Sequence, residues 1–93
     1  MKKSEKIFSA IFDQYVDRIY RFIFIKVSSQ EIAEDLTSET FLRGWEAFKN
    51  SENPGHNQKI ESPSAFLYQI ARNLIIDYYR EKGRTKTISA EYA

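Results

Sequence analysis

Apolar residues recur at three- and four-residue spacing over three stretches of the chain, which is typical of amphipathic α-helices. The first stretch predicts a helix from about Ser4 to Lys26. The wide apolar face of this helix comprises Ile7, Phe8, Ile11, Phe12, Tyr15, Val16, Ile19, Tyr20, Phe22 and Ile23.

The sequence Ser28-Ser29-Gln30-Glu31 fits a capping box, in which Ser28 caps a second helix and Glu31 reaches back to it. This helix is predicted to continue to about Phe48. Its first turns are acidic, as the helix dipole favours. The residues it offers for burial are Ile32, Leu36, Phe41, Trp45 and Phe48.

A polar, turn-rich stretch from Asn50 to Glu61 predicts an exposed loop before the third helix. Ser62 and Pro63 then fit the cap and the first position of that helix, and Gly83 predicts its end after about Lys82. The stripe expected to face the core is Leu67, Ile70, Ala71, Leu74, Ile75 and Tyr78. The opposite side carries Phe66, Gln69, Asn73, Asp77, Arg80 and Arg84, and one flank carries Tyr68, Arg72, Ile76 and Tyr79.

These elements predict an all-α fold, a compact bundle of three main helices, with a short extra turn near residues 61–66 left open. With 93 residues, the chain has room for one small domain, which we place at residues 1–84, followed by a flexible tail at 85–93. Three glycines, two prolines and no Val/Thr-rich alternating runs favour helices over strands.

Composition removes several classes of function. There is no cysteine, and the single histidine, His56, lies in the polar loop, so thiolate and histidine metal sites are not expected. The longest apolar run, Phe22–Ile25, is far shorter than the about 20 residues of a membrane span, and the basic start lacks the apolar core of a signal peptide. We therefore expect a cytoplasmic protein with no membrane insertion.

Two carboxylate pairs at i,i+4 spacing, Asp13 with Asp17 and Glu31 with Asp35, could in principle hold a cation or transfer protons. No histidine, third carboxylate cluster or glycine-rich phosphate loop accompanies them. We therefore expect no enzyme activity, no metal and no cofactor.

The formal net charge of +1 conceals an uneven distribution. Residues 1–30 carry six basic and three acidic groups, residues 31–52 carry two and six, and residues 68–93 carry five and three. An acidic segment between two basic ones could serve two partners of opposite charge, although ordinary solvated helix faces would give the same pattern.

The third helix combines the side chains that hold single-stranded nucleic acid: cations for phosphates, rings for stacking and an amide that can bind a base edge. The cations are Arg72, Arg80, Lys82, Arg84 and Lys86, the rings are Phe66, Tyr68 and Tyr79, and the amide is Asn73. The alternative, which is the more usual arrangement of interfacial tyrosines, is that Tyr68 and Tyr79 pack against the first helix with their hydroxyls in water.

The order of residues adds a resemblance to a known family. Asp35-Leu36-Thr37-Ser38-Glu39-Thr40-Phe41-Leu42-Arg43-Gly44-Trp45 resembles the D-L-x-Q-E-T-F-x-R-x-W signature of bacterial sigma factors, and in particular region 2 of the extracytoplasmic-function group in the sigma-70 superfamily. Residues 66–80 resemble the same group's W-L-Y-x-I-A-x-N-x-x-x-D-x-x-R helix, and residues 15–22 its opening helix. The resemblance spans about Phe8 to Arg84.

The resemblance implies a promoter-recognition domain that binds core RNA polymerase at its β′ clamp helices and captures the non-template strand of the minus-ten promoter element, supporting strand opening. Asp35 and Glu39 match the family's acidic clamp-binding positions, Ser38 stands where glutamine is usual, and Arg43 is expected to contribute. An anti-sigma protein is a further implied partner.

Within the third helix, Asn73 and Asp77 match positions that face promoter DNA in the family. The resemblance assigns phosphate contacts to four cations. Two rings are expected from their residue types to stack on bases, and one of them, Phe66, stands where tryptophan is common in the family. These residues are Arg72, Arg80, Lys82, Arg84, Phe66 and Tyr68. The loop at 50–61 corresponds to the family's specificity loop, which pockets a flipped base.

A full sigma factor of this group also carries region 4, which reads the minus-thirty-five element, and nothing after Arg84 is long enough to encode it. The chain is therefore expected to be region 2 alone, with its last residues beginning the interdomain linker. Two alternatives are a helical interaction module without a DNA role, such as a decoy or adaptor, and a helix-turn-helix repressor. The long loop argues against the repressor.

Overall fold

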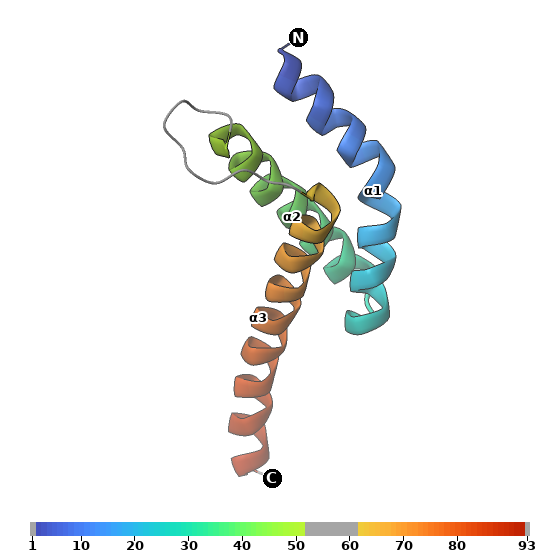
Figure 1. The fold of residues 1–93 in the computed structure, drawn as a ribbon. Coiled ribbons are helices and arrows are strands. Elements are labelled where there is room, and N and C mark those ends of the chain that lie inside the picture. Colours follow the sequence, from blue (N-terminus) through green and yellow to red (C-terminus); the bar gives the residue numbers. More distant parts are fainter. Residues whose placement is uncertain (1, 52–61, 93) are drawn as a thin grey trace.

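The computed structural model describes residues 2–51 and 62–92, with side chains described for 2–50 and 62–83. It contains three helices: α1 (Lys3–Val27), α2 (Gln30–Ser51) and α3 (Pro63–Tyr92). Each helix packs against the other two, and the second half of α3 extends beyond α1 and α2 (Figure 1). The predicted all-α three-helix bundle is confirmed. In the described part of the chain, no separate short helix precedes α3. The helical residues from Pro63 onward belong to α3 itself.

One apolar core joins the three helices, as their amphipathic spacing predicts. Its buried members are Ile19, Ile23 and Val27 of α1, Ala33 and Phe41 of α2, and Leu67, Ala71 and Ile75 of α3. Leu74 is also buried, and Ile70 and Tyr78 are half-buried, so the predicted inner stripe of α3 is confirmed. The wide face of α1 is only partly covered, since Ile7 and Phe12 remain exposed.

The connection between α1 and α2 corrects the predicted capping box. Ser28 ends α1 in the left-handed conformation, with φ 55° and ψ 31°, and its backbone N–H donates to the carbonyl of Phe24. Ser29 caps α2 instead, because its Oγ accepts a hydrogen bond of 3.3 Å from the backbone N–H of Ile32. The predicted cap was therefore one residue too early.

The two ends of α3 differ in how well the sequence predicted them. Ser62 caps the helix, as predicted. Its Oγ accepts a hydrogen bond from the backbone N–H of Ala65, and its backbone carbonyl accepts one from the backbone N–H of Phe66. The predicted end at Gly83 was wrong, because α3 continues through this glycine to Tyr92. Glycine costs a helix only about 1 kcal/mol relative to alanine, and its neighbours Glu81, Lys82 and Arg84 are good helix formers.

Candidate functional site

The residues of the sigma-like motif in α2 divide between the core and the surface. Thr37 and Thr40 are buried, and their hydroxyls donate to the carbonyls of Ala33 and Leu36 at 2.6 and 2.7 Å. Phe41 is buried with them. Because these hydroxyls bond within their own helix, they leave no polar group unsatisfied in the core.

The rest of the motif forms one stripe on the outer side of α2, which we call the α2 surface. It consists of Asp35, Ser38, Glu39, Leu42 and Arg43, all exposed except Glu39, which is partly exposed. Their spacing of three and four residues keeps them on one face of the helix. The four residues predicted to bind polymerase therefore lie together.

A single ion pair organises this surface. Arg43 Nε lies 3.0 Å from Glu39 Oε1, one turn apart, and both side chains are about half exposed. Such an exposed i,i+4 pair contributes only about 0.3–0.5 kcal/mol to stability, so it can be exchanged for contacts with a partner at little cost. Asp35 takes no part in an ion pair within the described residues.

Sequence reasoning missed Leu42, which is 55% exposed in the middle of the α2 surface. A single exposed leucine is ordinary on a protein surface, so Leu42 adds only an apolar contact among the four predicted polymerase-binding residues. The available signal was its position, seven residues after Asp35 and three after Glu39.

The predicted DNA-binding residues lie along α3, and we call the exposed ones together the α3 surface. Its exposed members are Arg72, Asn73, Asp77, Arg80 and Lys82. Phe66 and Tyr68 are half-buried. Arg84 lies in α3, but its side chain is outside the described residues, as are loop residues 52–61; Asn50 and Ser51, assigned to that loop, end α2 instead.

Both tyrosines that the sequence left undecided contact α1. The ring of Tyr68 meets that of Phe22 edge-on, with centroids 5.1 Å apart and an interplanar angle of 89°. Tyr79 is 45% exposed, and its hydroxyl donates to the backbone carbonyl of Lys26. The tyrosines are therefore held in place by α1 while part of each ring stays accessible.

The charges of Asp77, Arg80 and Lys82 remain accessible to a ligand. Lys82 Nζ lies 5.6 Å from the centroid of the Tyr78 ring, which leaves its charge unneutralised. Asp77 and Arg80, both described, form no ion pair with each other. The carboxylate of Asp77 is thus free to accept a hydrogen bond, and a base amine is a suitable donor.

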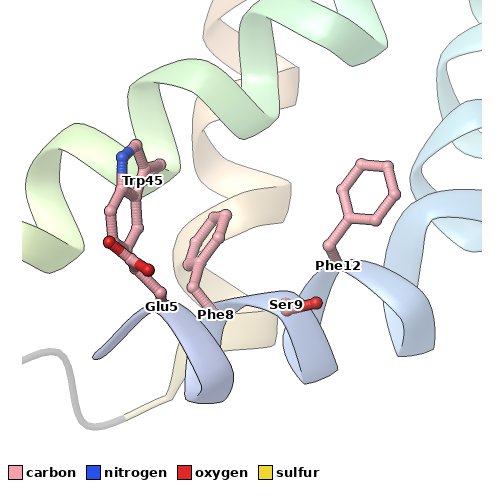
Figure 2. A pocket seen from close by; sticks show the side chains of 5 residues that line it. All are labelled: Glu5, Phe8, Ser9, Phe12 and Trp45. Atoms are coloured by element: carbon pink, nitrogen blue, oxygen red, sulfur yellow. The ribbon is translucent and has the colours of Figure 1, made fainter. Parts of the chain in front are cut away.

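Two shallow recesses lie elsewhere. One is lined by Glu5, Phe8, Ser9, Phe12 and Trp45, and Figure 2 shows the Phe8 and Trp45 rings between α1 and α2, with Phe12 further along α1. Its walls are apolar and carry a single carboxylate, so it lacks the converging polar groups of a catalytic site. The other is lined by Asp17, Tyr20, Arg21, Phe24 and Ile25, all of α1. Neither contains a residue of the α2 or α3 surface.

The described residues also bear on metals and membranes. No three His, Asp or Glu side chains among them gather closely enough to hold a metal ion. No helix in the described ranges combines the length and the apolar character needed to cross a membrane.

The fold is thus a helical bundle with two exposed polar surfaces, each built on a motif of the sequence. A family model described as sigma-70 region 2 matches residues 11–85, and the chain belongs to this family. The predicted resemblance is confirmed.

The curated relatives bear the group's name. The chain is 40% identical over 73 residues to the ECF RNA polymerase sigma factor BldN of Streptomyces coelicolor, covering 78% of this chain and 26% of the relative. It is 33% identical to SigM and 35% identical to SigW of Bacillus subtilis, both ECF RNA polymerase sigma factors, covering 85% and 99% of this chain. These matches cover 44% and 46% of SigM and SigW, so the chain spans less than half the length of these relatives. No solved structure gives a significant match.

Proposed function

We propose that this chain binds core RNA polymerase through the α2 surface and the non-template strand of a minus-ten promoter element through the α3 surface, and so supports strand opening. The relatives' names support the polymerase partner, since each is an RNA polymerase sigma factor. The role requires no catalytic group, because binding the unpaired strand more tightly than the duplex is enough to shift the equilibrium toward the open state.

The observation that carries the proposal is the division of the α2 motif. Phe41 and the two threonines, Thr37 and Thr40, are buried in the core, whereas Asp35, Ser38 and Arg43 are exposed and make no contribution to the core. Exposed Leu42 supplies an apolar centre for a protein interface whose rim is charged. Ser38 is shorter than the glutamine usual in the family, so it offers one fewer long hydrogen-bonding side chain to the clamp.

On the α3 surface, we propose that Arg72, Arg80, Lys82 and Arg84 bind phosphates, that Asn73 and Asp77 bind base edges, and that Phe66 and Tyr68 offer ring surface to bases. We further propose that an anti-sigma protein can cover these surfaces, since it could bind the same exposed charges. We also propose that this chain acts in the bacterial cytoplasm.

Calorimetric titration of the chain with a β′ clamp-helix fragment tests the polymerase contact. Asp35→Ala and Glu39→Ala are each expected to weaken binding at least tenfold, because removing one partner of a charged pair in an interface usually lowers the affinity by that much or more. Glu34→Ala is the matched control: Glu34 is an exposed acid in the same turn as Asp35, it pairs with Gln30 Nε2 at 3.0 Å, and it lies outside the α2 surface. Equal effects of Glu34→Ala and Asp35→Ala, or no binding by the folded parent, would contradict the proposed contact.

The alternative is a helical interaction module without a DNA role, and the contacts of Tyr68 and Tyr79 with α1 are what favour it. Salt dependence separates the two. Affinity for DNA falls as salt rises, and we call the steepness of log affinity against log salt the salt slope. If Arg72 binds a phosphate of single-stranded DNA, Arg72→Ala is expected to make this fall shallower by about 0.7. Under the alternative, the slope would be small and unaffected by this substitution.

A further inference from the structure

The last turns of α1 lie against the flank of α3 that carries Arg72, one of the proposed phosphate contacts. Phe22 meets Tyr68 edge-on, and one turn later along α1 the carbonyl of Lys26 accepts a hydrogen bond from the hydroxyl of Tyr79. On α3, Arg72 lies between the two tyrosines on the same flank, four residues after Tyr68 and seven before Tyr79. The end of α1 is therefore attached to α3 on both sides of Arg72.

Lys26 brings a positive charge to this place. Its Nζ lies 5.0 Å from the centroid of the Phe22 ring, the same ring that contacts Tyr68. A cation above an aromatic ring is positioned without losing its charge. Lys26 is exposed and forms no ion pair with any described residue.

We propose that Lys26 is a further DNA-binding residue, whose ammonium contacts a backbone phosphate of the strand that crosses the α3 flank beside Arg72. The inference rests on the proposed function, since it adds a residue of α1 to the proposed DNA-binding surface on α3. The competing explanation is that Lys26 only stabilises the C-terminal end of α1 through the helix dipole.

Lys26→Met tests the proposal while sparing the fold, because methionine keeps an unbranched apolar stem above Phe22 and removes only the charge. Arg21→Met is the matched control. Arg21 is an exposed cation of the same helix, and five residues of separation place it about 140° around the helix from Lys26. It lines the recess formed by α1 alone, and its Nε donates to the carbonyl of Asp17.

The measurement is fluorescence anisotropy of labelled single-stranded DNA of mixed sequence, titrated with core RNA polymerase saturated with the parent chain or a variant. Core polymerase alone gives the background. Lys26→Met is expected to weaken binding about fivefold at 0.1 M salt and to lower the salt slope by about 0.7, the value for one phosphate contact on a single strand. Arg21→Met is expected to match the parent, and Lys26→Arg to restore the slope.

The remaining outcomes separate the two proposals. If Arg72→Ala weakens binding and Lys26→Met does not, Lys26 serves only the helix end, and the proposed function stands. If Lys26→Met and Arg21→Met weaken binding equally, the effect is one of net charge, and the proposal for Lys26 fails. If the parent binds no better than core polymerase alone, the DNA role itself fails, and the proposal for Lys26 fails with it.

Discussion

At the scale of single residues, Gly44 lies where α2 closely approaches α1 and α3. A Cβ at this position would lie 2.8 Å from Leu67 Cδ2 and 3.5 Å from Phe8 Cζ. Leu67 is 1% exposed, so any shift of its side chain must be accommodated by its neighbours in the core. Overpacking of this kind costs about 1–3 kcal/mol, more than the up to about 1 kcal/mol gained in helix propensity. We expect Gly44→Ala to lower the free energy of unfolding by roughly 1 kcal/mol in urea denaturation.

Gly83 provides the control, because it lies in a helix with no atom within 4 Å of an added Cβ. Gly83→Ala is expected to raise the free energy of unfolding by up to about 1 kcal/mol through helix propensity alone. A stabilisation of the same size in Gly44→Ala would show that α2 and α3 are not in close contact there.

All residues of the α2 surface except Leu42 could be predicted from sequence, because helical spacing decides which side chains share a face. The fates of Tyr68 and Tyr79 could not, because a contact between rings on two helices depends on how those helices cross. The exposure of Phe12 escaped prediction for a related reason. Its spacing fits the apolar face of α1, but its ring lies at the edge of the bundle, 4.9 Å from the ring of Phe41 and 41% exposed.

At the scale of elements, the junction between α1 and α2 assigns different tasks to two adjacent serines. Ser29→Ala removes the Oγ that accepts from Ile32, so it is expected to cost about 1 kcal/mol of stability. Ser28→Gly relieves the left-handed conformation at φ 55°, so it is expected to stabilise by about 0.5–1 kcal/mol. Thermal unfolding of both variants measures the two effects. A loss in Ser28→Gly with no change in Ser29→Ala would restore the cap to Ser28.

The sequence placed these helices well but located their ends less accurately. The S-x-x-E capping pattern fits Ser28 alone, and no glycine marked the left-handed residue that ends α1. At the end of α3, a glycine was present but no turn followed, because a terminator acts only where the chain can bend away. Helix ends thus depend on the path of the chain between helices, and the spacing of apolar residues within a helix does not determine that path.

At the scale of the whole molecule, the core and the far end of α3 are separate. Among the residues with described side chains, the last buried one is Ile75, and α3 runs on to Tyr92 beyond the bundle (Figure 1). Removing residues 84–93 should therefore leave the free energy of unfolding within about 0.5 kcal/mol of the parent, a change of less than about 4 °C in Tm. The helical circular dichroism signal should fall in proportion to the number of helical residues removed.

The same truncation tests the proposed role of Arg84. If Arg84 binds a phosphate, the salt slope of DNA binding should also become shallower by about 0.7. A fall of many degrees in Tm would instead show that the last turns of α3 are part of the folded core, whereas an unchanged slope would remove Arg84 from the DNA-binding surface.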